Sequence, residues 1–255
     1  MEDREVPLFD EFSKYYDLFV NWERRLANEL PFLLGVLSRI GARRVLDAAC
    51  GTGMHAIALA REGYEVTCAE PGVRMLERAA ENAEKAGVKV DGIRAGFGEL
   101  HRKVSGSFDA VLCLGNSLPH ALSREELIAA LADFAAVLRP GGATIIQNRN
   151  YDLVLKQRVR FMPLETARMH DRELLFFRFI DFGDDLLTFN MVTLLKEAGQ
   201  WRYEVGSTKH RPITRDEADS ALGAAGFTRL EYYGDYQGSS FDADRSGDLI
   251  IVGYR

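Results

Sequence analysis

Short apolar runs alternate with helical patterns through most of the first 150 residues of this 255-residue chain. The runs are nearly continuous, as in strands that are covered on both faces. Strands that alternate with helices form right-handed βαβ units on a parallel sheet. The expected strands span residues 43–50, 64–71, 88–96, 108–116 and 143–150. The expected helices span residues 55–63, 73–87 and 124–142, the last one closed by Pro140-Gly141-Gly142.

The pattern differs at the two ends of the chain. Residues 8–40 have apolar positions at helical spacing, with Pro31 expected to start a second helix. After residue 150, three strand-like runs with no helix between them predict an antiparallel meander. A helix with Thr214 as N-cap and Glu217 at the capping-box position follows, and then two final strands. The three runs and the two final strands span residues 172–182, 186–197, 201–213, 228–236 and 248–255.

The bulk composition excludes several classes of protein. A net charge of −6 lacks the basic footprint of a nucleic-acid binder. No apolar run reaches the ~18 residues that span a bilayer, and the charged N-terminus has no signal-peptide core. Cys50, Cys68 and Cys113 have no metal-ligand spacing and lie in apolar runs, so we expect buried, reduced thiols in a cytoplasmic protein.

The turn "DAACGTG" after the first strand predicts a ligand site. A dinucleotide-binding fingerprint would have a third glycine where Ala56 stands, although alanine is sometimes accepted there. A P-loop is excluded because no Gly-Lys-Ser/Thr follows. Gly51 and Gly53 carry no side chain, so we expect the backbone to approach a ligand closely.

"VLDAACGTG" resembles the first motif of the class I S-adenosylmethionine (SAM) methyltransferases. The resemblance implies a Rossmann-like fold and SAM as the cofactor. Asp47 would lie near the cofactor's amino group or the turn's amides, and Glu70 would accept the ribose hydroxyls. The residues expected around the adenine are Pro71, Met75, Gly96 and Phe97.

Two further motifs resemble the glycine and glycine/sarcosine N-methyltransferase branch. They are Leu-Gly-Asn-Ser (residues 114–117) with His120, and Arg-Asn-Tyr-Asp (residues 149–152). The resemblance implies that the Ala49 carbonyl takes the methionine amino group and that Asn150 touches the acceptor. It also assigns Leu114, Gly115 and Asn116 to the cofactor site.

The chain departs from this branch at two arginines. Ser38, followed by Arg39, stands at the column we assign to the arginine for the methionine carboxylate. Phe189 and Asn190 stand where the arginine for the substrate carboxylate is expected. The candidates to replace the latter are Arg149, Arg178 and Arg211.

Methyl transfer needs an aligned acceptor lone pair and a dry site, but no obligatory base. We therefore expect Asn150, Tyr151 and Arg178 at the acceptor, and His120 in a structural or proton-handling role. Tyr15, Tyr16 and Trp22 lie on the N-terminal helical segment, where they could cap the cofactor. Tyr16 is counted with the catalytic candidates, and Trp22 with the cofactor-binding ones. No metal is expected.

Together these features predict an α/β fold: a doubly wound, mostly parallel seven-stranded sheet with an N-terminal helical lid and a small antiparallel β insert. The lid spans residues 1–40, the SAM-binding core 41–150, the acceptor-side insert 151–213, and the last helix and two strands 214–255.

The predicted function is SAM-dependent methylation of a small polar acceptor, at an amine nitrogen. Small-molecule O-methylation and a SAM-binding regulatory protein without turnover remain alternatives. The regulatory reading is favoured if Asn150 and the loop at residues 116–120 point away from the cofactor. The expected partner is the small-molecule acceptor, and we expect no binding to nucleic acid or to a membrane. The sequence leaves open whether the chain forms a homo-oligomer.

Overall fold

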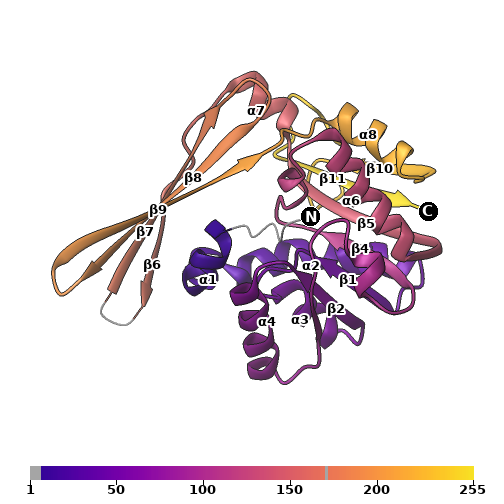
Figure 1. Ribbon diagram of the computed structural model, residues 1–255, viewed down its shortest axis with the longest axis horizontal. Helices are drawn as coiled ribbons and strands as arrows, with labels where there is room; N and C mark the ends of the chain where they lie inside the picture. The colour runs from indigo at the N-terminus through magenta and orange to yellow at the C-terminus, as the bar shows by residue number, and fades with distance from the viewer. Residues whose placement is uncertain (1–6, 170–171) are drawn as a thin grey trace.

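The apolar runs form the central sheet of the computed structural model, which describes residues 7–169 and 172–255 (Figure 1). The strand order is β3-β2-β1-β4-β5-β11-β10, with β11 antiparallel to both of its neighbours. This confirms the predicted doubly wound, mostly parallel seven-stranded sheet. The strands are β1 (Arg44–Ala48), β2 (Glu65–Glu70), β3 (Asp91–Arg94), β4 (Phe108–Cys113), β5 (Leu138–Arg149), β10 (Arg229–Tyr233) and β11 (Asp248–Tyr254).

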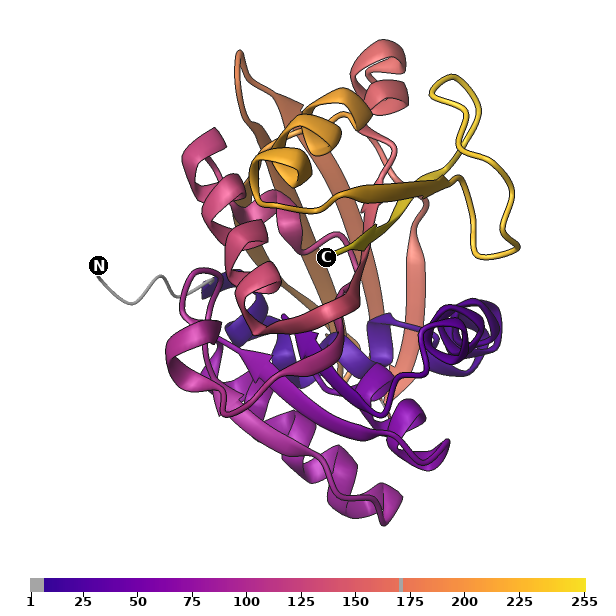
Figure 2. The ribbon, with the colours of Figure 1, turned by 90° about the vertical axis from the view of Figure 1, so that its right-hand side faces the viewer.

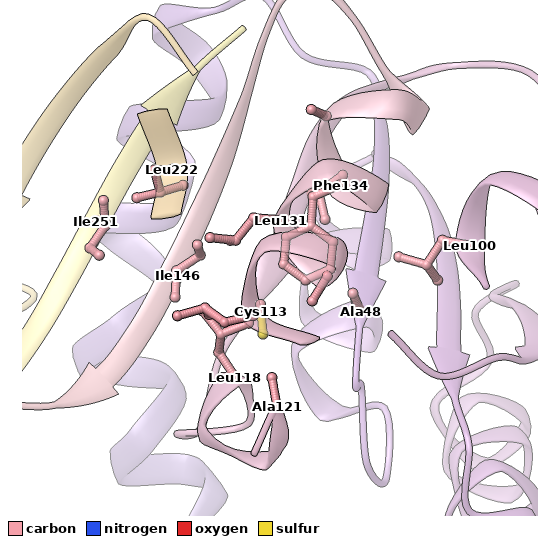
Figure 3. Close-up of a cluster of buried hydrophobic side chains, with 14 of the residues drawn as sticks. Ala48, Leu100, Cys113, Leu118, Ala121, Leu131, Phe134, Ile146, Leu222 and Ile251 are labelled. Atoms are coloured by element: carbon pink, nitrogen blue, oxygen red, sulfur yellow. The ribbon is translucent and has the colours of Figure 1, made fainter. Parts of the chain in front are cut away.

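Helices cover both faces of this sheet, which explains why its inner strands β1, β4 and β11 are mostly apolar and buried (Figure 2). Leu131 and Phe134 of α6 and Leu222 of α8 pack with Ile146 and Ile251 on one face (Figure 3). Helices α2 and α3 pack on the other face. The helices of the core are α2 (Trp22–Arg39), α3 (Met54–Arg61), α4 (Val73–Ala86), α5 (Leu100–Lys103), α6 (Arg124–Val137) and α8 (Arg215–Ala224).

Two predicted helix boundaries are wrong. Pro31 lies inside α2, and the chain breaks instead at Asn21, whose side chain accepts a hydrogen bond from the backbone of Arg24. Helix α6 ends at Val137, so Pro140-Gly141-Gly142 belongs to β5, where the pairing with β4 shifts register. The predicted N-cap at Thr214 is present, because its side chain accepts from the Glu217 amide.

The insert is larger than predicted. It forms a separate four-stranded antiparallel sheet in the order β6-β7-β8-β9, which confirms the meander and adds one strand. A short helix, also not predicted, leads into it. The elements are α7 (Tyr151–Gln157), β6 (Glu165–Met169), β7 (Arg172–Phe182), β8 (Leu187–Glu197) and β9 (Gln200–His210).

Helix α1 (Pro7–Phe19) lies between the insert sheet and the core (Figure 1). Leu8, Phe12 and Tyr15 pack against one face of the insert sheet, in a cluster that includes Phe176 and Met191. Residues 1–6, which the predicted lid also includes, lie outside the described residues. They are also part of the N-terminal stretch in which the sequence shows no signal-peptide core.

Cys50, Cys68 and Cys113 are buried and free. None of the helices in the described part of the chain combines the length and apolar character that a membrane crossing requires.

Candidate functional site

The carboxyl ends of β1, β2, β4 and β5 open onto one cavity of about 1210 Å³. Parallel α/β sheets bind ligands at this edge, where the strand order reverses. Helix α1 and the insert sheet supply the opposite wall, through residues such as Tyr16, Arg178 and Phe189. The cavity therefore lies between the core and the two elements outside it.

The turn after β1 forms one end of the cavity. Ala49 and Gly51 line it, with φ angles of +65° and +57°. A Cβ added to Gly51 would meet no atom within 4 Å, so the space beside this glycine is open. At Gly53, which is absent from the cavity wall, an added Cβ would lie 2.9 Å from the Cβ of Ala79 in α4. The expected close approach of a ligand therefore fits Gly51, whereas Gly53 allows α3 and α4 to pack closely.

Glu70 ends β2 and is almost fully buried at the cavity wall. Its carboxylate accepts hydrogen bonds from the backbone N–H groups of Gly51 and Gly72, each at 3.0 Å. Burial raises the pKa of Glu70 to about 7, although these two hydrogen bonds act in the opposite direction. A single carboxylate thus bridges the glycine turn and the start of α4.

Asp47 is buried in β1, and the backbone N–H groups of Ala49, Cys50, Gly51 and Gly53 donate to other acceptors, so these amides do not bind Asp47 as one of its two expected positions required. The Gly51 amide donates to Glu70 instead. Within the described residues, Oδ2 of Asp47 has no hydrogen-bond partner, and burial raises the pKa of this carboxyl to about 6. An unpaired buried carboxylate oxygen costs free energy unless a ligand group satisfies it.

The residues predicted around adenine lie together. Pro71, Met75, Gly96 and Phe97 all line the cavity next to Glu70. Met75 is buried, and Phe97 contacts Phe134 edge to face, with the ring centroids 5.6 Å apart. They form an apolar part of the cavity wall beside the carboxylate.

A positively charged side chain that could take the role sought at Ser38 and Arg39 is Arg25, which the sequence analysis did not single out. Arg39 instead pairs with Glu231, with a nitrogen–oxygen distance of 2.8 Å, and does not line the cavity. Arg25 lines the cavity beside Gly115 and donates from Nε to Glu29 at 2.9 Å. Glu29 also contacts His55 at 2.6 Å, and these two partners hold the pKa of Glu29 below its ordinary value despite its burial. The i, i+4 spacing of Arg25 and Glu29 is the one sequence signal of this pair.

The loop after β4 contains the 3₁₀ turn η1 (Leu118–His120) and lines the cavity through Gly115, Asn116, Ser117 and His120. Asn116 donates to the Tyr151 hydroxyl and accepts from the Arg149 backbone N–H, both at 3.0 Å. Leu114 is buried behind this wall rather than exposed on it. The two motifs that resemble the glycine N-methyltransferase branch, residues 114–117 and 149–152, therefore contact each other directly.

Asn150 does not line the cavity, contrary to its expected contact with the acceptor. Its side chain caps α7 by accepting from Leu153, and its amide nitrogen donates to backbone carbonyls of residues 242–246. Asn150 thus fixes the path of the chain from the core into the insert. The regulatory interpretation required both Asn150 and the loop at residues 116–120 to point away from the cofactor site. Asn150 does so, but the loop lines the cavity.

Of the two aromatic candidates in the N-terminal segment, Tyr16 and Trp22, only one lines the cavity. Tyr16 lines the cavity, and burial raises the pKa of its hydroxyl. Trp22 does not line it, but donates from its indole to Asp17 at 2.9 Å and packs edge to face on His55. Trp22 therefore supports Tyr16, with ring centroids 6.2 Å apart, rather than facing a ligand directly.

Two of the three candidate arginines reach the far end of the cavity. Arg149, from the end of β5, and Arg178, from β7, both line it. Arg178 has its guanidinium 4.7 Å from the Phe19 ring centroid, 3.5 Å from Glu165, and its Nε is buried without a partner among the described residues. Arg211 is instead paired with Glu217 at 2.5 Å and lies outside the cavity wall.

The far end also contains His210, which the sequence did not single out. It ends β9 and lies against His120, with ring centroids 4.7 Å apart. Only the return of the insert to the core brings these positions together. In the described part of the chain, no group of three or more His, Cys, Asp or Glu side chains is arranged to hold a metal ion.

Comparison with known proteins agrees with this geometry. A family model described as a methyltransferase domain matches residues 45–142. The chain is 39% identical over 146 residues to a glycine/sarcosine N-methyltransferase of Aphanothece halophytica, a match that covers 57% of this chain and 55% of the relative. The chain thus spans about half the length of that relative.

A second relative matches over more of its length. The glycine/sarcosine N-methyltransferase of Halorhodospira halochloris is 29% identical over 243 residues, covering 92% of this chain and 84% of the relative. A SAM-dependent methyltransferase of Clostridium acetobutylicum has the same fold, with a TM-score of 0.79 at 15% identity over 97% of this chain and 98% of that one. The chain is thus similar in fold to SAM-dependent methyltransferases, and the curated relatives that it resembles in sequence are glycine/sarcosine N-methyltransferases.

Proposed function

We propose that this chain transfers a methyl group from SAM to the nitrogen of a small polar amine that resembles glycine or sarcosine. The observation that carries the proposal is the single cavity that connects the glycine turn and Glu70 with Arg149 and Arg178. The turn and Glu70 would hold the cofactor, and Arg149 and Arg178 lie on the wall of the same cavity.

The residues at the turn fit SAM. Glu70 would accept the ribose hydroxyls, with Met75 and Phe97 against the adenine. The carbonyl of Ala49 is suited to the methionine amino group, and Arg25 to its carboxylate, whereas Asp47, with its unpaired Oδ2, does not line the cavity. The open space beside Gly51 gives the cofactor room.

When bound, SAM supplies a methyl group that its sulfonium already activates. The protein's part is to hold the amine lone pair about 3 Å from that carbon and to exclude water. Tyr16 and Phe19, from α1, line the cavity and would help to exclude water from it. Free amine can be drawn from solution, so no base in the chain is required.

Arg178 and Arg149 support an acceptor with an anionic group. Burial, and then the charge of Arg149, lowers the pKa of Arg178, as expected for two cations that share one apolar site. A carboxylate between them would relieve this repulsion and accept paired hydrogen bonds. Phe189, at the position where the branch places its carboxylate arginine, lines the cavity, whereas Asn190 bonds to Asp181 and Ser207 within the insert sheet.

The division of the chain follows from these roles. We assign α1 (Pro7–Phe19) to a cover over the site, residues 41–150 to cofactor binding, 151–213 to acceptor selection, and 214–255 to completing the core sheet. Helix α2 (Trp22–Arg39), which the sequence analysis counted with the lid, packs on the core sheet instead. The three buried free cysteines support a reducing compartment such as the cytoplasm.

Binding of S-adenosylhomocysteine, measured by calorimetry, tests the cofactor site. Replacing Glu70 by Ala is expected to cost about 2–4 kcal/mol of binding, because two hydroxyls lose a charged acceptor. Since the pKa of Glu70 is raised to about 7, its carboxylate is largely protonated at pH 6 and ionised at pH 8. The affinity of the native protein should therefore be higher at pH 8 than at pH 6.

Glu70→Gln is the control for this pH effect, because its neutral side chain should flatten the dependence that comes from Glu70. A Glu70→Ala loss below about 0.5 kcal/mol would reject the ribose assignment. Turnover is then tested with a panel of amino acids, amines and hydroxy compounds. Methylated amines are the expected products, methylated hydroxy compounds would favour O-methylation, and cofactor binding without any turnover would favour a regulatory protein.

A further inference from the structure

Two histidines face each other at the acceptor end of the cavity. His120 ends η1 in the core, and His210 ends β9 in the insert. Their ring planes are nearly perpendicular, at 87°, with centroids 4.7 Å apart. The Arg211 backbone N–H donates to the Pro119 carbonyl at 2.8 Å, which fixes the end of β9 against η1. The backbone therefore determines the arrangement of the pair.

His210 is buried, with 6% of its surface exposed, but its Nε2 has no hydrogen-bond partner among the described residues. Its ring stacks on Phe189, with centroids 5.4 Å apart, and Phe9 contacts the His120 ring edge to face at 5.6 Å. A buried polar atom that lacks a partner costs about 1–3 kcal/mol. Because His210 lines the cavity, a molecule seated against its ring would be the candidate for the partner that Nε2 lacks.

The surroundings keep both imidazoles uncharged. Burial lowers the pKa of His120 to about 4. Burial, and then the proximity of His120 and Arg149, lowers the pKa of His210 to about 3. A neutral imidazole can accept a hydrogen bond at its unprotonated nitrogen, but one with so low a pKa is a poor proton acceptor. The chemistry of His210 therefore suits holding an amine rather than deprotonating it.

We propose that His210 binds the methyl acceptor by accepting a hydrogen bond from its amine N–H at Nε2, with His120 as a positioning residue that fixes the His210 ring. The inference rests on the proposed function and identifies the class of acceptor more closely. An amine held by one N–H presents its lone pair in a fixed direction, as in-line methyl transfer requires. The site thus selects a primary or secondary amine, because a tertiary amine has no N–H to donate.

The test compares His210→Phe with His210→Gln, using the best acceptor of the amine panel. Phenylalanine keeps a ring against Phe189 and His120 but removes Nε2, whereas glutamine retains an oxygen that can accept the N–H. His210→Phe should lower kcat/KM by about 10- to 100-fold, with a fall in kcat as well as a rise in KM. His210→Gln should retain a substantial part of the activity, and S-adenosylhomocysteine affinity should stay within about twofold in both variants.

His101→Gln is the matched control, because His101 bonds to Asp133 outside the cavity and its replacement should leave the kinetics unchanged. His210→Leu serves as a second nitrogen-free variant if the phenylalanine variant is not folded by circular dichroism. The N,N-dimethyl form of the acceptor should not be methylated.

Native kcat/KM in the nitrogen-free variant would overturn the inference. So would equal losses in the Gln and nitrogen-free variants, which indicate packing alone, or methylation of the tertiary amine at the rate of the secondary one. All of these leave the proposed function intact. A native protein that binds no S-adenosylhomocysteine contradicts the proposed function instead.

Discussion

The two glycines of the turn after β1 have different physical roles, although the sequence motif treats them alike. Both have positive φ, so alanine at either position costs about 1–2 kcal/mol of backbone strain. At Gly53 the added methyl would also press on Ala79 at 2.9 Å, whereas at Gly51 it would enter open space beside the cavity.

Gly53→Ala should therefore lower the free energy of unfolding by about 2–4 kcal/mol, because overpacking adds to the strain. Gly51→Ala should lower it by only about 1–2 kcal/mol, but weaken S-adenosylhomocysteine binding at least about tenfold by filling the ligand's space. Urea unfolding and calorimetry on both variants separate the two effects. Equal binding losses at equal stability would mean that the two glycines share one role.

The same residue-scale contrast explains what the sequence could predict at the site. Glu70 was predictable because it ends a strand next to the glycine turn, and parallel strands bring such ends to one edge. Arg25 and His210 were not, because their positions depend on how α2 and the insert fold back over that edge. Asn150 was predicted by motif alone, and its hydrogen bonds show an N-cap instead.

At the scale of elements, α1 connects the glycine turn, α4 and the insert. Asp17 accepts from Thr52 in the turn at 2.6 Å and from Asn82 in α4 at 3.0 Å. Asp10 accepts from the Arg74 backbone N–H at the start of α4, at 2.7 Å. Ligand binding at the turn should therefore also stabilise α1.

We expect S-adenosylhomocysteine to slow hydrogen exchange in α1 as well as in the turn, because a ligand would hold both sides of this contact. Asp17→Ala should raise exchange in α1 and reduce the slowing there, while α8 serves as an internal control. Slowing in the turn with no change in α1 would show that α1 is a fixed packing element and not a lid.

The elements themselves were easier to predict than their limits. The sequence pattern identified all the strands of the central sheet, most clearly the buried inner strands β1, β4 and β11. It failed at Pro31, because the packing of Leu33, Val36 and Leu37 stabilises α2 across a residue that normally ends a helix. It also missed β6, a mostly exposed strand with little apolar pattern.

At the scale of the whole molecule, the insert sheet stands apart from the core sheet (Figure 1), and residues of both parts line one cavity. The core supplies the glycine turn and Glu70, and the insert supplies Arg178, Phe189 and His210. Because the two groups of residues belong to different sheets, the proposed roles predict that a change in the insert alters the choice of acceptor without weakening cofactor binding.

Arg178→Leu tests this separation. If Arg178 holds an acceptor carboxylate, the substitution removes a charge-assisted hydrogen bond worth about 1.5–3 kcal/mol, and the KM of an anionic amine should rise about 10- to 100-fold. S-adenosylhomocysteine affinity should not change. Arg160→Leu is the matched control, because Arg160 pairs with Asp181 on the insert but lies outside the cavity wall. Native kinetics in Arg178→Leu, or a neutral or cationic amine as the best acceptor, would make Arg178 a structural residue of the insert, whose cation–π contact with Phe19 would then be its role.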